Sequence, residues 1–302
     1  MAKLIQWFPG HMKKAMRDME EKRALCDGVI CVLDSRAPIA TYNPKLPEIF
    51  AGKPVLYVLN KSDLSDGKSE KFAAMIEAQG KPCVAISAVN GASRRVLEKR
   101  LQILTKEKRE RAESKGVTRR FRYTVVGIPN TGKSTVVNLL GGAKRAKTGD
   151  IAGVTRDVRW IKCADFDLLD TPGTMPPSCK TQYLARHLAY IGSLNDDILD
   201  IADVALELLK ELKANYPAAL QERYGIDCGG NNAETDKTAD EEERTREAVE
   251  MLEMACRRRG FILRGGEFDY ERGARAVIDD FRKGRLGKIC LENPSDFADV
   301  KF

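Results

Sequence analysis

The stretch that decides the fold is Gly127-Ile128-Pro129-Asn130-Thr131-Gly132-Lys133-Ser134. It matches the phosphate-binding loop pattern G-x-x-x-x-G-K-[ST] at every defined position. An apolar, β-branched run at 122–126 precedes it and a helical pattern follows at 134–140, which is the strand–loop–helix setting that the pattern requires. Glycines let backbone N–H groups approach phosphates closely, and the helix N-terminus adds a partial positive charge. The sequence therefore predicts a nucleotide phosphate site here.

Each polar residue of this loop has an expected role. Lys133 is placed to neutralise the β- and γ-phosphates, and the Ser134 hydroxyl to ligate Mg²⁺. We also expect contacts with the phosphates from Thr131, Gly132 and Thr135.

A second motif, Asp170-Thr171-Pro172-Gly173, ends the apolar run 166–169. Asp170 is placed to hold Mg²⁺ through water, and the Gly173 N–H to meet the γ-phosphate. Thr155 lies between the two motifs, where a switch loop would bring it to the metal. A single threonine is weak evidence, and only its position supports this role.

Asn60-Lys61-Ser62-Asp63 follows the apolar run 55–59. In GTPases an Asn-Lys-x-Asp at this place reads guanine. Asp63 would accept hydrogen bonds from the base N1–H and N2–H₂, a pattern that adenine lacks, while Asn60 and Lys61 brace the loop and cover the ring. Taken alone, a polar strand-to-helix turn explains the stretch equally well.

A further strand pattern at 82–86 ends in Ser87-Ala88, where a backbone N–H would meet guanine O6. The two motifs together favour guanine. Their order is unusual, because a conventional GTPase has its phosphate loop first and its base-reading motifs last. A circular permutation reconciles the order, since strand and helix packing does not depend on where the chain is cut.

Strand patterns alternate with helical ones through the first half of the chain, which predicts an α/β fold with a mostly parallel sheet and helices on both faces. After about residue 180 only helical patterns remain, at 184–212, 247–259 and 273–283. We therefore expect a circularly permuted P-loop GTPase domain at 1–180 and an all-α domain at 181–302. Residues 229–243 are acidic and poor in apolar side chains, so they predict a mobile loop.

Composition excludes several classes of protein. The 302 residues are 43% hydrophobic and 31% charged, the balance of a globular protein with a real core. The chain has no apolar run of about 18 residues and no signal-peptide pattern, so we expect a cytoplasmic protein without a membrane span. Eight cysteines without a Cys-x-x-Cys pair and only two histidines argue against a disulfide framework and a zinc cluster.

Positive charge is concentrated in two tracts. Residues 94–122 hold twelve Lys/Arg against four Glu, and residues 257–288 hold ten against five acidic residues. Such tracts point to a polyanionic partner, although solvated helix faces are the alternative for each tract alone. Arg257-Arg258-Arg259 is the candidate RNA contact.

The chain resembles the circularly permuted GTPases of the YlqF/RbgA type, the ribosome biogenesis GTPase A family. The resemblance is carried by Ile5-Gln6-Trp7-Phe8-Pro9-Gly10-His11-Met12, by the five nucleotide motifs and by tail segments at 265–269 and 285–289. It implies a GTPase that acts late in assembly of the large ribosomal subunit, with GTP/GDP and Mg²⁺ bound and a helical RNA-binding domain that contacts ribosomal RNA. We expect a monomer in solution.

The resemblance implies specific roles in hydrolysis for two residues, His11 and Asn130. The family lacks the glutamine that orients the attacking water in Ras-like enzymes, and Thr174 follows Gly173 here, where relatives usually carry an aliphatic residue. The proposed substitute is His11, for which a surface histidine is the alternative. Asn130 is expected to help hold K⁺ between the phosphates, and a loop-bracing amide is the alternative.

The function that we expect is a ribosome-dependent GTPase that serves as an assembly checkpoint, with Lys133, Asn130, Gly173 and His11 taking part in hydrolysis. A nucleotide-gated RNA-binding scaffold with incidental hydrolysis is the alternative. A P-loop ATPase or kinase is disfavoured by the base-reading motif. Trp7 and Phe8 are read as a hydrophobic anchor and His187 as a structural residue.

Overall fold

The computed structural model describes residues 10–142, 159–176, 179, 181–228 and 240–302. The chain forms two compact units. The first runs to Leu188 and takes in Gly192–Leu194 and Cys290–Phe302, while the second comprises Ala189–Ile191 and Asn195–Ile289.

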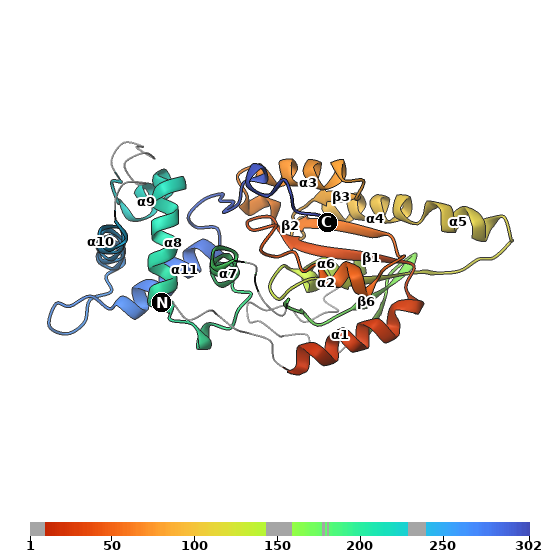
Figure 1. Ribbon diagram of the computed structural model, residues 1–302, viewed down its shortest axis with the longest axis horizontal. Helices are drawn as coiled ribbons and strands as arrows, with labels where there is room; N and C mark the ends of the chain where they lie inside the picture. The colour runs from red at the N-terminus through yellow and green to blue at the C-terminus, as the bar shows by residue number, and fades with distance from the viewer. Residues whose placement is uncertain (1–9, 143–158, 177–178, 180, 229–239) are drawn as a thin grey trace. The chain divides into compact units, whose positions relative to one another are not determined.

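A six-stranded sheet forms the centre of the first unit (Figure 1). Its strand order is β3-β2-β1-β4-β6-β5, and every neighbouring pair is parallel except β5 with β6. The strands are β1 (Gly28–Asp34), β2 (Val55–Asn60), β3 (Cys83–Ala85), β4 (Phe121–Val126), β5 (Arg159–Lys162) and β6 (Phe166–Asp170). The phosphate-loop strand β4 is therefore central, although β1 to β3 precede it in the chain.

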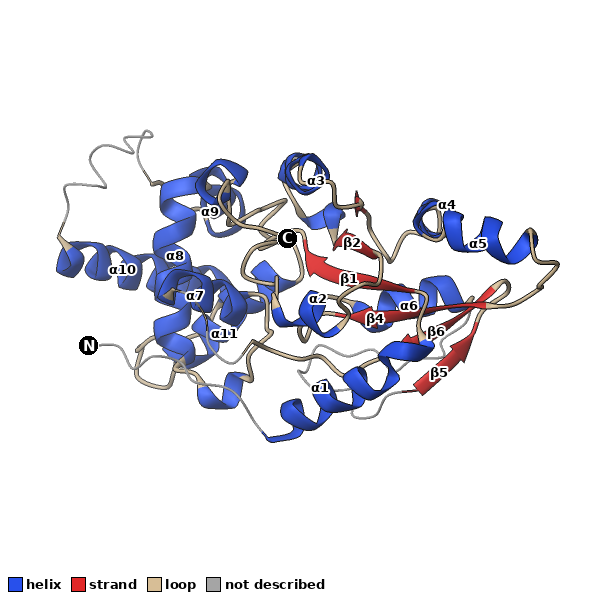
Figure 2. Ribbon diagram, turned by 45° about the vertical axis from the view of Figure 1, so that its right-hand side comes forward, coloured by secondary structure: helices blue, strands red, loops and turns tan. Residues whose placement is uncertain are grey.

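Both faces of the sheet are covered by helices. Helices α4 (Ser93–Leu104) and α6 (Lys133–Gly141) contact each other and share a buried core with β1, β2, β4 and β6. Alternate strand residues such as Cys31 and Leu59 are also fully buried and point to the opposite face, which α1 (Gly10–Lys22) and α2 (Lys45–Ile49) cover (Figure 2). The near-continuous apolar strands follow from burial on both faces.

Two more helices connect the strands of this unit. Helix α3 (Lys68–Ala78) packs on β3 through Phe72 and Ile76. Helix α5 (Lys106–Glu113) continues from α4 beyond the sheet (Figure 1) and has no buried residue. Its sequence, KEKRERAE, carries the middle of the first basic tract into solvent.

The second unit is helical. Helix α8 (Ile201–Asn215) contacts α9 (Pro217–Tyr224), α10 (Glu241–Arg259) and α11 (Tyr270–Arg282). Aspartates cap three of these helices, because Asp200, Asp240 and Asp269 each accept a hydrogen bond from a first-turn N–H. Helix α7 (Gln182–Tyr190) precedes α8 and crosses the boundary between the units, since the first unit runs to Leu188 and the second takes in Ala189–Ile191.

The sheet, its mostly parallel pairing and the permuted order are as the sequence predicts, and three details differ. The single helical pattern at 184–212 is two helices, α7 and α8, separated by a turn at Gly192. The units divide near residue 190 rather than at 181, and Cys290–Phe302 returns to the first unit. Residues 241–243 of the expected loop form the first turn of α10, while 229–239 lie outside the described residues.

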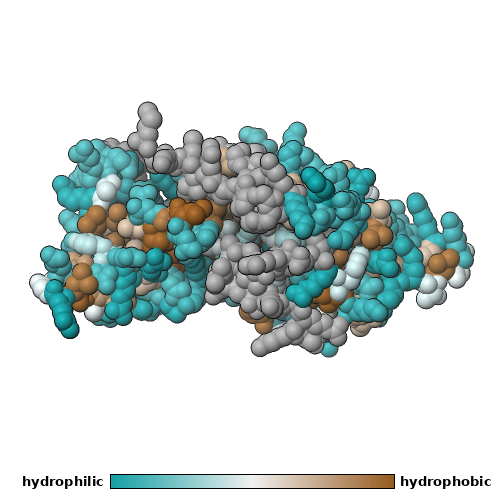
Figure 3. All heavy atoms as spheres, turned by 90° about the horizontal axis from the view of Figure 1, so that it is seen from below, coloured by the Kyte–Doolittle hydropathy of each residue, from teal (hydrophilic) through white to brown (hydrophobic). Residues whose placement is uncertain are grey.

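Among the described residues, no helix is long and apolar enough to cross a membrane. On the face drawn in Figure 3, hydrophobic residues form small areas between hydrophilic ones.

We predict that Gly273→Ala destabilises the second unit. A Cβ at Gly273 in α11 would overlap the Cys256 Sγ of α10, so the two helices have to separate, at a cost of about 1–3 kcal/mol in the free energy of unfolding. Without that clash the change would stabilise a helix interior. In a Cys256→Ala background the overlap is gone, and Gly273→Ala should cost nothing. Denaturant titration of the four proteins measures this, and an equal loss in both backgrounds would contradict the packing argument.

Candidate functional site

The phosphate loop lies between β4 and α6, as the motif predicts. Gly127 and Gly132 have positive φ angles of 150° and 88°. A Cβ at Gly127 would lie 2.5 Å from Val32 O, and one at Gly132 would overlap Asn60 Nδ2. Only glycine therefore fits where the loop crosses β1 and where it meets the base-reading loop.

The base-reading loop is tied directly to the phosphate loop. Asn60 Nδ2 donates to Thr131 O at 2.9 Å, and Asn60 Oδ1 accepts from the Ala88 N–H at 3.0 Å. Lys61 Nζ donates to Asn130 O at 2.5 Å. Asn60 thus holds three motifs together. The Ala88 N–H, which we expected at guanine O6, donates to Asn60 in this structure.

Asp63 stands one turn further on, in a short 3₁₀ helix (Ser62–Leu64), with its side chain exposed. Exposure leaves both carboxylate oxygens accessible to a base. The hydroxyl of Ser93 donates to Ser87 O at 2.8 Å, which fixes the neighbouring Ser87-Ala88 turn on the start of α4.

A buried ion cluster beneath this loop escaped the sequence analysis. Asp34, at the carboxyl end of β1, is fully buried and pairs with Arg36 and Lys61, each at 2.8 Å. Burial alone would raise the pKa of Asp34, but the two cations outweigh it and hold the pKa below its usual range. Asp34 and Arg36 therefore fix Lys61, whose Nζ also reaches the phosphate loop.

Lys133 and Asp170 carry the other buried charges of this site. Lys133 Nζ donates to Ile128 O at 2.7 Å, and burial lowers its pKa to about 8 although Asp170 opposes the shift. Burial raises the pKa of Asp170, against the pull of Lys133 and Arg159. Neither carboxylate oxygen of Asp170 makes a well-formed hydrogen bond with a described residue.

Comparison with known proteins agrees with this geometry. Residues 122–224 match the family described as 50S ribosome-binding GTPase. Ribosome biogenesis GTPase A of Bacillus cereus is 37% identical over 299 residues, which cover 98% of this chain and 96% of that protein. The chain belongs to the ribosome biogenesis GTPase A family.

More distant relatives span the same length. Ribosome biogenesis GTPase A of Thermotoga maritima is 28% identical over 98% of this chain and 97% of its own. The crystal structure of GNP-bound YlqF from T. maritima superposes with a TM-score of 0.63 at 26% identity, covering 93% of this chain and 98% of that one. The circularly permuted GTPase fold and guanine-nucleotide binding expected from the sequence are thereby confirmed.

The donor set around Asp170 fits the Mg²⁺ that such GTPases use. A buried carboxylate that makes no well-formed hydrogen bond is costly unless a cation compensates it, and Mg²⁺ prefers oxygen ligands such as this carboxylate and a hydroxyl like that of Ser134 in the first turn of α6. Thr155, the third expected ligand, lies outside the described residues.

Gly173 and Thr174 close the loop after β6. A Cβ at Gly173 would lie 2.8 Å from Pro129 N and 3.0 Å from Lys133 Nζ, so a side chain there would obstruct the phosphate loop. The Thr174 N–H donates to Gly127 O at 3.2 Å, and its fully buried hydroxyl has no partner among the described residues. The Thr174 hydroxyl is thus unused within the described part of the chain, so the side chain fills its place without needing a polar group.

Other expected residues lie apart or outside the described part. His11 is in the first turn of α1, but its side chain, like the whole of Trp7 and Phe8, is not described. His187 is fully buried, and its Nδ1 lies 3.1 Å from Glu292 Oε1. Because the two residues are 105 positions apart, the sequence does not indicate this contact. Ser134 and Thr135 begin α6 and are half-buried.

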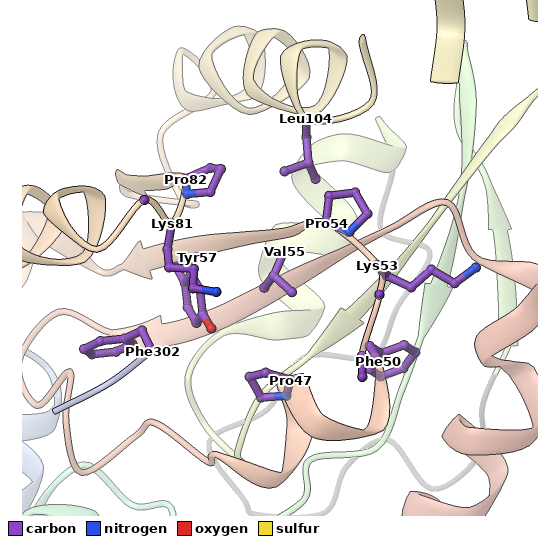
Figure 4. Close-up of a pocket in the computed structure, with 13 residues that line it drawn as sticks. Pro47, Phe50, Lys53, Pro54, Val55, Tyr57, Lys81, Pro82, Leu104 and Phe302 are labelled. Atoms are coloured by element: carbon purple, nitrogen blue, oxygen red, sulfur yellow. The ribbon is translucent and has the colours of Figure 1, made fainter. Parts of the chain in front are cut away.

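A half-open cavity of about 380 Å³ lies at the opposite edge of the sheet (Figure 4). Its lining includes Pro54 and Val55 at the amino end of β2, Lys81 and Pro82 before β3, and Phe302. None of its residues belongs to a nucleotide motif. Parallel strands place their carboxyl ends at the other edge, so this cavity is separate from the nucleotide site.

We predict that nucleotide binding takes up a proton at Lys133. Its pKa of about 8 leaves roughly three quarters of the amines neutral at pH 8.5, and a bound diphosphate restores the charge by raising that pKa. Calorimetry of GDP binding at pH 8.5, in buffers of different ionisation enthalpy, should therefore report an uptake of more than half a proton. Lys133→Arg, which stays protonated, is the control and should take up none. Equal uptake by both proteins would assign the proton to another group.

Proposed function

We propose that this GTPase binds the precursor of the large ribosomal subunit and hydrolyses GTP to GDP and phosphate as a late assembly checkpoint in the cytoplasm. The observation that carries the proposal is the guanine-nucleotide site itself, in which Asn60 and Lys61 tie the base-reading loop to a complete phosphate loop. The names of the full-length relatives supply the ribosomal setting.

The chain's own residues divide the work at the nucleotide. Asp63 accepts from the guanine N1–H and N2–H₂, while Lys61, fixed by Asp34, covers the ring. Lys133 neutralises the β- and γ-phosphates, and the Gly173 N–H binds the γ-phosphate. Mg²⁺, held by Ser134, Thr155 and Asp170, supplies further stabilisation of the developing negative charge when bound.

The residue after Gly173, where Ras-like GTPases have the glutamine that orients water, is not suited to that role here. Thr174 occupies the place of the Ras-like glutamine, but its hydroxyl is fully buried and its N–H is used by Gly127 O. Hydrolysis by the isolated protein should therefore be slow. We propose that His11 orients the water once the ribosomal subunit brings it to the γ-phosphate, and that K⁺ beside Asn130 adds positive charge.

We expect purified large ribosomal subunits to stimulate GTP hydrolysis at least about tenfold in KCl, because they complete the site through His11. His11→Ala should lose most of this stimulation and keep its affinity for GDP. Lys14→Ala, an exposed change on the same helix, is the matched control and should be stimulated like the unchanged protein. The measurement is the steady-state release of phosphate with and without subunits.

Absence of stimulation with subunit binding intact would instead favour the nucleotide-gated scaffold. Full stimulation of His11→Ala would remove this histidine from the mechanism but leave the checkpoint function standing.

A hairpin of the second unit is the RNA contact that we propose. Residues 261–269 turn at Gly265 and Gly266 and close through a bridge between Ile262 and Phe268. Exposed arginines stack on its phenylalanines, with Arg272 4.4 Å and Arg259 5.8 Å from the Phe261 ring centre. Such stacking orders the guanidinium groups. Arg259 also pairs with the buried Asp280 at 4.0 Å, so Arg272 is the better placed of the two to donate to phosphates.

Much of the rest of the second basic tract is engaged internally. Buried Asp280 accepts from Arg223 and Arg285, and Arg282 pairs with Asp196 at 2.7 Å. These pairs reduce the charge that this part of the unit presents to a polyanion, so the hairpin and the start of the tract are the stronger candidates.

We predict that Arg264→Glu combined with Arg272→Glu weakens binding to purified large subunits at least about tenfold and flattens its dependence on salt, since each lost phosphate contact removes roughly one unit of the slope. Arg246→Glu, at the other end of α10, is the matched control and should change affinity less than about twofold. Sedimentation at two KCl concentrations measures both quantities. Equal binding by the double variant and the control would exclude the hairpin.

A further inference from the structure

A three-residue segment far along the chain packs on the phosphate loop. The buried Ser193 hydroxyl donates to Pro129 O at 2.7 Å, and Asn130 Nδ2 donates to Gly192 O. Gly192–Leu194 belongs to the first unit, whereas the residues on both sides of it, Ala189–Ile191 and those from Asn195 on, belong to the second. Nothing in the sequence motifs points to this contact.

The end of α7 aims this segment at the loop. Gly192 has a φ of 73°, in the left-handed region that follows many helices, and the Ser193 N–H donates back to Leu188 O at 2.9 Å. An L-residue at 192 would be strained in this turn. The turn therefore presents the Gly192 carbonyl and the Ser193 hydroxyl together.

The segment is anchored away from the nucleotide site as well. His187 on α7 meets Glu292, whose two carboxylate oxygens accept from the Ile39 N–H at 2.6 Å and the Ala40 N–H at 3.0 Å. Tyr183, also on α7, donates its hydroxyl to Leu291 O at 3.0 Å. Because these contacts are mostly buried, the end of α7 has a fixed support on which to hold the loop.

The contact selects one orientation of the Asn130 amide. A carbonyl oxygen can only accept hydrogen bonds, so Gly192 O takes the amide nitrogen, and Asn130 Oδ1 is turned away from it. Only the oxygen of an asparagine side-chain amide can ligate a cation, because the amide nitrogen is a donor. The Asn130 backbone is held independently, at a φ of 60°, by the donation of Lys61 Nζ to its carbonyl. The two roles that the sequence left open for Asn130, amide brace and cation ligand, are therefore compatible.

We propose that Gly192 and Ser193 are positioning residues for GTP hydrolysis. They hold the phosphate loop at Pro129 and Asn130 so that Asn130 Oδ1 is presented to K⁺. This inference rests on the proposed potassium role of Asn130 and adds the element that sets its orientation.

The test is a double-mutant cycle of Ser193→Ala and Asn130→Ala, read out as phosphate release at saturating GTP over a KCl titration at constant ionic strength. Losing one buried hydrogen bond corresponds to roughly a fivefold effect, so Ser193→Ala should lower the K⁺-stimulated rate about three- to tenfold and raise the half-saturating K⁺ concentration. KM for GTP and GDP affinity should stay within about twofold. In the Asn130→Ala background, Ser193→Ala should have no further effect.

Two controls separate positioning from general destabilisation. Ser114→Ala removes a hydroxyl that donates to Arg111 O on the surface of α5, and should leave the K⁺ titration unchanged. Gly192→Ala should shift the titration like Ser193→Ala, whereas Gly225→Ala, at a φ of 74° after α9, introduces similar strain elsewhere and should not. Thermal unfolding of each variant reports any loss of stability.

The outcomes distinguish this inference from the function on which it rests. Equal rates of the unchanged protein in KCl and NaCl would refute the potassium role, and the positioning role with it. A normal K⁺ response with Ser193→Ala and Gly192→Ala both unaltered would refute positioning alone. An effect of Ser193→Ala that persists in full without Asn130 would likewise overturn it, because the residue would then act elsewhere.

Discussion

Parallel pairing of β1 with both β2 and β4 is the constraint on which the nucleotide site depends. Parallel strands end at the same edge of a sheet, so the loops after β1, β2, β4 and β6 meet there in whatever order the chain visits them. The hydrogen bonds of Asn60 then join the loops across β1. This is the physical reason why a permuted chain can build the same site, since the contacts between its motif loops are set by strand neighbours and not by sequence order.

Five charged side chains at that edge differ in how fully the protein compensates their charge. Asp34 is matched by Arg36 and Lys61, and this cluster is complete within the protein. Lys133 and Asp170 are not, because Lys133 donates only to a carbonyl in the hydrogen bonds described and Asp170 makes no well-formed hydrogen bond with a described residue. Burial lowers the pKa of Lys133 and raises the pKa of Asp170, so it favours the uncharged form of each group. A phosphate would offset the cost of burying Lys133, and a divalent cation that of burying Asp170, so these two residues favour ligand binding. The Asp34 cluster, in contrast, holds Lys61 and the phosphate loop in place.

The spaced motifs of the candidate site could be predicted from the sequence, whereas the residues that hold these motifs in place through contacts with other protein residues could not. The phosphate loop, Asn60, Lys61 and Asp63 form dense local patterns with one chemical explanation. Asp34 and Arg36 are an acid and a base two residues apart at the end of a strand, which many surface turns share. Edge strand β5 has three exposed residues in four, so it lacks the apolar run that marks the central strands.

Long-range partners were beyond sequence reasoning for the same reason. Glu292 meets His187 across 105 residues, and Ser193 meets Pro129 across 64, so nothing local marks either pair. The domain division near 190 also follows from these contacts, because the helical period of α7 is like that of α8 and only its packing differs.

The permutation gives α7 a position that a conventional chain order would not. Since β6 is the last strand of the sheet along the chain, the loop holding Asp170 and Gly173 leads into α7, and α7 leads into the second unit. The covalent path from the γ-phosphate loop to the helical unit is therefore short, and it touches the phosphate loop again at Gly192 and Ser193. The stretch of chain that leads from one unit to the other is therefore also a direct contact of the phosphate loop, through the Gly192 carbonyl and the Ser193 hydroxyl. A conventional chain order, with the phosphate loop first and β6 in the middle of the domain, would not place the start of a following domain at this position.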